Sequence, residues 1–272
     1  MKSCLLFLSV ALFLGGCGDS RGGEHDSGNN GGQEIDGGTE SSETPDDPVA
    51  PQVPNDEEEI PSPTNSSACF NETFYQVGTI VSTELERRDG GTQLPNYSET
   101  TEVTRVTSYR GYSDVFEQSI TSGSSTSTYY ILADTSAKSV TTLGQLLDGE
   151  EFTYHPSGLL LDYDIALGET KSYPTVTEQI DGNETSSAEY SFEFLRTERV
   201  TVPAGTFDTC VMVLTYNSTS SDGTSATTEY TQYIGVGNGL MIREDSMITT
   251  SDGDQFTGSD RLVSATINGN PI

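Results

Sequence analysis

The sequence predicts an all-β domain over residues 67–272, and three observations lead to this fold class. Beyond Cys69, apolar and polar residues alternate, with frequent Thr, Tyr, Val and Ile, as is typical of half-buried strands. Turn sequences that carry Gly and Asp separate these stretches. No stretch has a sustained helical period, apart from a short turn expected near residues 143–147. We therefore expect a single antiparallel meander with few helices, which forms a curved sheet, a half-barrel or a barrel.

The strands are expected where the alternation is clearest, at residues 73–86, 99–109, 112–121, 127–134, 137–143, 151–155, 172–180, 187–202, 208–218, 225–235, 239–250 and 255–267. Short hairpin turns join several of them, at residues 122–123, 181–183, 221–223 and 251–254. Two strands show apolar rows on one face, made of Tyr190, Phe192 and Phe194 in one and of Cys210, Met212, Leu214 and Tyr216 in the next. Each row must be covered by other parts of the protein.

Residues 1–16 have the features of a lipoprotein signal peptide. Lys2 gives a positively charged start, and residues 4–14 form an apolar run that is too short to span a bilayer. Residues 14–17, Leu-Gly-Gly-Cys, match a lipobox, in which small residues precede the cysteine that receives lipid. We predict that Cys17 becomes the lipidated N-terminus of an exported, membrane-anchored protein. The alternative is an ordinary secretory signal with an incidental cysteine.

The residue after the lipidated cysteine bears on localisation within the cell envelope. Lipoproteins that stay in the inner membrane of enteric bacteria typically carry Asp at this position. This chain has Gly18 there and places Asp19 one residue later. By that resemblance the outer membrane is favoured, and display toward the periplasm or the cell exterior stays open.

Residues 17–66 are predicted to form a disordered, acidic tether between the lipid and the domain. Gly, Ser, Asp, Glu and Pro dominate this tract, and it has too few apolar residues to bury a core. A flexible tract of about 50 residues has a root-mean-square span on the order of 40 Å. That span lifts the domain clear of the membrane surface. The alternative function for the tract is to bind an envelope partner.

The charge of the chain limits its partners. The formal net charge is −30 at pH 7, and the sequence pI is about 4.1. A nucleic-acid partner needs a basic surface, so this class is excluded. Solubility in a salty or crowded environment is the simpler reason for such acidity, and specific binding of cations is the alternative.

Two of the four cysteines remain available in the mature domain. Cys4 leaves with the signal peptide and Cys17 carries the lipid, which leaves Cys69 and Cys210. Because exported compartments are oxidising, we predict a disulfide between these two residues. Two separate buried thiols are the alternative, since the sequence gives no distance between them.

Three segments resemble those of uncharacterised exported bacterial lipoproteins. Residues 200–207 read Val-Thr-Val-Pro-Ala-Gly-Thr-Phe, residues 165–170 read Ile-Ala-Leu-Gly-Glu-Thr, and residues 233–241 read Tyr-Ile-Gly-Val-Gly-Asn-Gly-Leu-Met. The segments follow the order expected for that family. The resemblance implies a curved antiparallel sheet similar to the lipoprotein-carrier folds, whose concave face can hold acyl chains. Tyr173 stands near the position where those proteins usually have Trp, and this chain has no Trp.

The residues of these segments are interpreted as structural turns. Pro203 interrupts strand hydrogen bonding, Gly205 permits a backbone conformation that other residues resist, and Phe207 re-enters the core. Together they predict a tight corner between two strands. A bulged connection is expected at three further glycines, Gly235, Gly237 and Gly239. A corner that contacts a ligand is the alternative.

The sequence shows no catalytic constellation, and we expect no catalytic residue, metal or cofactor. His25 lies in the tether, and His155 precedes a turn-forming Pro-Ser-Gly. A calcium site would need Asp252, Asp254 and Asp260, but these lack the spacing of an EF-hand loop, and a solvated hairpin turn is the better account. Paired carboxylates of the glycosidase type stay open, because the chain has 42 acidic residues.

Two functional hypotheses follow. In the first, a lipid-anchored envelope lipoprotein is a binding module whose concave face accepts an apolar ligand or an envelope protein. In the second, it is a structural or surface-interaction protein without a ligand cavity. An enzyme is the third and least favoured class. The first two differ in whether the inner face of the sheet is open or filled by its own side chains.

Overall fold

The computed structural model describes residues 63–272. The predicted signal peptide at residues 1–16, the predicted lipidation site Cys17 and nearly all of the predicted tether at residues 17–66 lie outside the described residues.

The described chain is almost entirely β-structure, so the predicted all-β, antiparallel class is confirmed. Two 3-10 helices, η1 (Ser66–Cys69) and η2 (Glu72–Tyr75), come first. The strands follow as β1 (Ile80–Asp89), β2 (Thr92–Gln93), β3 (Tyr97–Tyr109), β4 (Tyr112–Ser122), β5 (Ser125–Asp134), β6 (Ser139–Leu147), β7 (Glu150–His155), β8 (Leu159–Asp162), β9 (Thr170–Ile180), β10 (Asn183–Val202), β11 (Gly205–Ser220), β12 (Ser225–Gly235), β13 (Met241–Thr250), β14 (Gln255–Ile267) and β15 (Asn270–Pro271).

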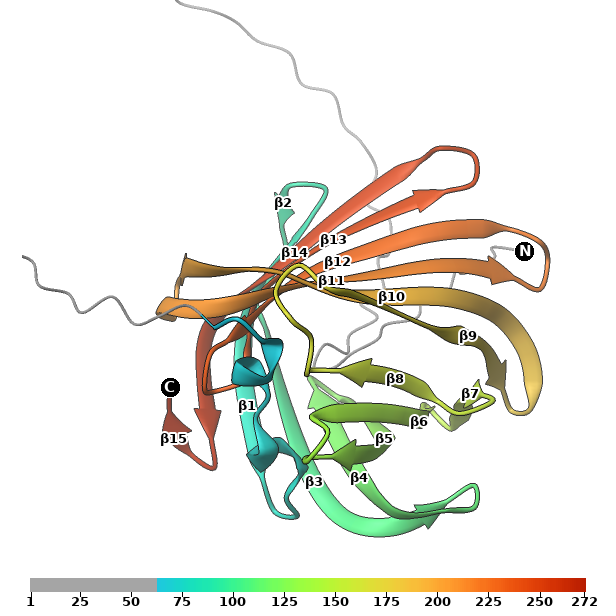
Figure 1. Ribbon diagram of the computed structural model, residues 1–272, viewed down its shortest axis with the longest axis horizontal. Coiled ribbons are helices and arrows are strands. Elements are labelled where there is room, and N and C mark those ends of the chain that lie inside the picture. Colours follow the sequence, from blue (N-terminus) through green and yellow to red (C-terminus); the bar gives the residue numbers. More distant parts are fainter. Residues whose placement is uncertain (1–62) are drawn as a thin grey trace, which may run out of the picture. The chain divides into compact units, whose positions relative to one another are not determined.

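The strands form one sheet that closes into a ring (Figure 1). Neighbours in sequence pair along most of the sheet, and β14 then pairs with β1, from Val81 opposite Ile267 to Asp89 opposite Gly258. The ring is not a regular barrel, because one edge of β6 is shared between two short strands. Its second half pairs with β7 and its first half with β8.

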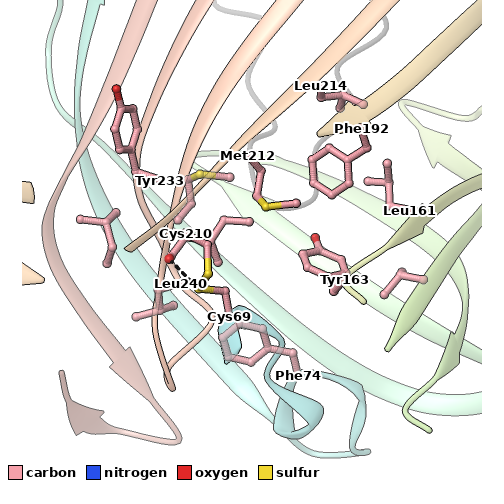
Figure 2. Packing of buried hydrophobic residues seen from close by; sticks show 14 of the residues in the cluster. Cys69, Phe74, Leu161, Tyr163, Phe192, Cys210, Met212, Leu214, Tyr233 and Leu240 are labelled. Atoms are coloured by element: carbon pink, nitrogen blue, oxygen red, sulfur yellow. Dashed lines mark hydrogen bonds between the residues drawn. A yellow bond between two sulfur atoms is a disulfide. The ribbon is translucent and has the colours of Figure 1, made fainter. Parts of the chain in front are cut away.

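The apolar core lies on the inner face of this ring (Figure 2). The predicted rows on β10 and β11 are buried: Phe192, Phe194, Met212 and Leu214 have no exposed surface, and Tyr190 and Tyr216 have less than 5%. They share one cluster with Leu161 and Tyr163 from the chain around β8 and with Leu240. Complete burial of a large apolar side chain contributes about 1.5–3 kcal/mol, so these rows are a main source of stability.

Two predicted elements were wrong. The strand expected from residue 73 begins only at Ile80, because the side chain of Asn71 caps η2 by accepting from the N–H of Thr73, and Gly78 turns the chain at a φ of 88°. The helical turn expected near residues 143–147 is part of β6. A β-bulge opposite Tyr130 and Ile131 shifts the alternation there, so that the apolar spacing imitates a helical one.

Candidate functional site

The structure brings Cys69 and Cys210 together as a disulfide, with their Cα atoms 6.2 Å apart. The prediction is therefore confirmed. Cys69 ends η1, and Cys210 lies on β11 opposite Ile234 of β12. The bridge thus fastens the N-terminal segment to the middle of the sheet (Figure 2).

The glycine segment of residues 235–239 connects β12 to β13 and lies against this same N-terminal segment. The N–H of Gly237 donates to the carbonyl of Ala68 at 2.9 Å, and the amide of Asn71 donates to the carbonyl of Asn238 at 2.7 Å. Gly239 has a φ of 70°, and a Cβ atom placed on it would lie 2.6 Å from the Cβ of Asn71. The contact therefore requires glycine at this position.

The corner between β10 and β11 is a two-residue turn at Pro203 and Ala204. Gly205 has a φ of 141°, and Val202 pairs with it across the turn. The N–H of Ala204 donates to the carbonyl of Leu262 on β14 at 3.0 Å. Phe207 is partly buried and packs against the core. The corner thus joins the hairpin to β14.

A small hollow lies beside the disulfide, with a volume of about 20 Å³. Phe70, Phe74, Tyr75, Tyr163 and Met241 are among the residues that line it. An apolar ligand of ordinary size needs a cavity of about 300 Å³ or more. In this part of the inner face, side chains of the protein itself fill the space.

A much larger hollow, of about 480 Å³, lies over β9 to β13. It is lined by Thr175, Ser187, Ala188, Glu189, Asn217, Ser218, Thr219, Ser225, Ala226, Thr227, Thr249, Thr250 and Ser251. Most of these residues are on the face opposite the core, because they alternate along the strands with buried neighbours such as Tyr190 and Tyr216.

The lining residues form rows across the sheet. Glu189 pairs with Asn217, Asn217 with Thr227, and Thr227 with Thr249. Within this row the hydroxyl of Thr227 donates to the side-chain oxygen of Asn217 at 2.9 Å. In the next row the hydroxyls of Thr219 and Ser225 are 3.1 Å apart. Hydroxyl and amide groups therefore repeat across neighbouring strands. This surface could not be predicted from the sequence, because only the strand register places these residues side by side.

The residues considered for catalysis or calcium do not form a site with one another. His155 ends β7, where its Nε2 lies 3.3 Å from the hydroxyl of Thr153. Asp252 accepts a hydrogen bond from the hydroxyl of Thr250 in an exposed turn, whereas Asp260 forms a salt bridge with Arg87. Among residues 63–272, no group of three or more His, Cys, Asp or Glu residues is arranged to hold a metal ion. No helix within those residues has the length and apolar character needed to cross a membrane.

Comparisons with known proteins show little. No family model matches the sequence. No curated protein matches it either. A candidate lipoprotein from Parabacteroides distasonis is 14% identical over 71% of this chain and 96% of its own, with a TM-score of 0.38. A candidate exported protein with a YmcC-like fold from Bacteroides fragilis is 15% identical over 70% of this chain and 96% of its own, also with a TM-score of 0.38. These values indicate only a distant likeness.

Proposed function

We propose that this chain is a lipid-anchored protein of the bacterial cell envelope that holds a neutral, polyhydroxylated envelope component, such as a glycan strand, in the hydroxyl-lined hollow over β9 to β13. The observation that carries the proposal is the hollow itself, whose volume of about 480 Å³ is that of a small-molecule site.

The chemistry of the lining favours this class of ligand. Ser and Thr hydroxyls and the amide of Asn217 each offer both donors and acceptors, and Glu189 adds an acceptor. None of the lining residues is cationic, so an anionic ligand would meet no compensating charge. None is aromatic, and the apolar residues of the lining are the small Ala188 and Ala226. A ligand rich in hydroxyls can replace the hydrogen bonds that water makes at this surface.

The apolar-ligand hypothesis has less support. Large side chains fill the part of the inner face that surrounds the Cys69–Cys210 disulfide, and the hollow there has a volume of about 20 Å³. The acyl-chain binding that the resemblance to lipoprotein carriers implies would need space that this end lacks. The proposal therefore differs from both hypotheses: it keeps a bound envelope component but places it on the polar face of the sheet and not on the apolar inner face.

The predicted N-terminus supports an envelope location. Lipid on Cys17 would anchor the chain, with the outer membrane favoured by Gly18. A tether spanning on the order of 40 Å would let the domain reach an envelope polymer at some distance from the bilayer. The proposal includes no catalytic step and no cofactor.

The test is co-sedimentation of the mature protein, in nonionic detergent, with cross-linked dextran and with isolated peptidoglycan. We expect retention on at least one of these glycans, and a several-fold loss in an Asn217→Ala/Thr227→Val variant. The matched control is Thr201→Val, because Thr201 bonds to Thr206 in a similar cross-strand hydroxyl pair outside the hollow. Equal retention of the double variant and the wild type would contradict the proposal, as would no retention of the wild type on either glycan.

A further inference from the structure

A row of polar side chains faces the inside of the ring on β12, β13, β14 and β1. In the strand register, Gln232 lies opposite Glu244, Glu244 opposite Asp260, and Asp260 opposite Arg87. Gln232 is 2% exposed, and its amide nitrogen donates to Glu244 at 2.9 Å. Arg87 donates two hydrogen bonds to Asp260, at 3.1 and 3.2 Å.

Tyrosines and further carboxylates continue this row around the ring. The pKa of Tyr230 is raised mainly by burial and to a smaller extent by the charge of Glu244. The pKa of Tyr216 is also raised mainly by burial, and neighbouring tyrosines, Tyr230 and Tyr154 among them, raise it further. Electrostatic interactions also join the remaining members of the row. Tyr154 interacts with Glu178 and with Tyr129. Tyr129 in turn interacts with Glu99, and Tyr97 interacts with both Glu99 and Asp260. We call these inward-facing residues the tyrosine–carboxylate girdle, comprising Arg87, Tyr97, Glu99, Tyr129, Tyr154, Glu178, Tyr216, Tyr230, Gln232, Glu244 and Asp260.

Two buried polar atoms of the girdle have no hydrogen-bond partner within the described part of the chain. They are the hydroxyl of Tyr216, whose side chain is 3% exposed, and the side-chain oxygen of Gln232. Buried polar groups are normally hydrogen-bonded, and an unsatisfied one costs free energy. Because the amide nitrogen of Gln232 is bound to Glu244, its free oxygen lies beside that carboxylate. This oxygen can only accept, so the missing partner at this place is a donor.

The charges of the girdle indicate the nature of that donor. Four carboxylates, Glu99, Glu178, Glu244 and Asp260, face one guanidinium, Arg87, which is bound to Asp260. Two of them accept hydrogen bonds from neutral groups: Glu178 from the hydroxyls of Thr185 and Ser186, and Glu244 from Gln232. At pH 8, above its raised pKa of about 7, Glu244 is ionised while its partner Gln232 is neutral, so this buried carboxylate attracts a cation strongly.

We propose that the tyrosine–carboxylate girdle binds an organic cation with primary ammonium groups, at the place where Glu244 and Gln232 face the inside of the ring. An ammonium group offers three N–H donors, enough for the Gln232 oxygen and the Glu244 carboxylate beside it. Tyrosine rings add cation–π attraction. This site is on the face opposite the hydroxyl-lined hollow, and it stands whether or not that hollow binds a glycan.

The test is calorimetric titration of the mature chain, in nonionic detergent at pH 8, with 1,4-diaminobutane. We expect binding that weakens at least tenfold in Glu244→Gln. The matched control, Glu229→Gln, removes the same charge from the neighbouring strand β12 at a residue that alternates with Tyr230, and it should bind as the wild type does. The neutral analogue 1,4-butanediol should not bind. Since the chain has 13 Tyr and no Trp, tyrosine fluorescence gives a second readout of the same site.

Several results would overturn the proposal: no binding of the diamine to the wild type, equal affinity in Glu244→Gln and Glu229→Gln, or displacement of the diamine by an equal concentration of calcium chloride. If Glu244→Gln fails to fold, Gln232→Met serves in its place, because it keeps a side chain of similar length and removes the unpartnered oxygen. A loss of about threefold or more in that variant supports the site, and an unchanged affinity counts against it.

Discussion

The hydroxyl of Tyr190 satisfies both backbone groups of Leu160: it accepts from the N–H at 2.9 Å and donates to the carbonyl at 3.2 Å. Leu160 belongs to β8, which pairs with β6 on one side only. Along the edge of β8 that has no strand partner, the hydroxyl of Tyr173 likewise accepts a hydrogen bond from the N–H of Asp162, at 3.1 Å. Two stacked tyrosines of β9 and β10 thus take the place of a neighbouring strand and close the ring at its irregular seam.

Removing this hydroxyl should destabilise the protein. Tyr190→Phe keeps the ring but leaves the N–H and the carbonyl of Leu160 without their partner, at a cost of about 1–3 kcal/mol in the free energy of unfolding. Urea unfolding measures this change. Tyr112→Phe, at an exposed tyrosine, is the control and should lie within about 0.5 kcal/mol of the wild type. An equally small effect at Tyr190 would mean that water replaces the hydroxyl.

The disulfide should supply a large share of the stability. It closes a loop with a sequence separation of 141, and the chain-entropy model gives about 4–5 kcal/mol for such a loop. We expect Cys69→Ala/Cys210→Ala to lower the melting temperature by roughly 10 °C or more while the β-sheet circular dichroism persists at low temperature. A reducing agent should lower the melting temperature of the wild type and leave that of the double variant unchanged. A reductant effect on the double variant would point to another cause.

Alanine substitutions at two glycines with similar backbone angles should distinguish the cost of a steric clash from the cost of backbone strain. Gly239 and Gly253 have φ values of 70° and 92°, but only a Cβ on Gly239 would meet a neighbour, Asn71, at 2.6 Å. Gly253→Ala should therefore cost about 1 kcal/mol from strain alone. Gly239→Ala should cost clearly more, because the N-terminal segment must also move. If denaturant unfolding gave equal losses in the free energy of unfolding for the two variants, the N-terminal segment would move away from the new methyl group at no cost.

The girdle should make stability depend on pH. Burial raises the pKa of Glu244 to about 7, although the hydrogen bond from Gln232 partly offsets it, and burial also raises the pKa of Glu178. The folded state then holds these protons more tightly than the unfolded state. The resulting stability is full below pH about 4.5 and is lost as the pH rises to about 7.

We expect the free energy of unfolding to fall by on the order of 1–3 kcal/mol between pH 5 and pH 8 in the absence of amines. Glu244→Gln should flatten this dependence, and Glu229→Gln should keep it. Urea titrations at the two pH values provide the measurement. A rise in stability across the same interval would contradict the assignment.

Local signals in the sequence predicted the hairpins and the faces of the strands. At the β9–β10 turn, Asp181 and Gly182 have positive φ, as the Asp-Gly pair indicates, and the buried rows on β10 and β11 follow the alternation. The disulfide was predicted from the two cysteines that remain after the predicted signal peptide and lipidation site, and from the oxidising compartment that such a signal implies. Each of these features depends on neighbours in the chain or on composition.

Features that depend on distant strands could not be predicted. The pairing of β1 with β14 leaves no mark in either segment, and β8 is only four residues long. The hydroxyl-lined hollow and the girdle depend on register across several strands, where a shift of one residue would turn every side chain to the other face. Asn71 and Gly78 delay the first strand through a cap and a turn that the alternation of residues 73–86 concealed.

The closure of the sheet between its first and last long strands has a consequence for how the chain reaches its native state. Val81 finds its partner Ile267 only after all intervening residues are available. A contact of such high sequence separation places this domain among proteins of high contact order, which fold in milliseconds to seconds or more slowly. A chain delivered N-terminus first would therefore leave one edge of β1 without its strand partner until delivery ends. During that interval the unpaired edge is a template for association with other chains, and folding assistance would act there first.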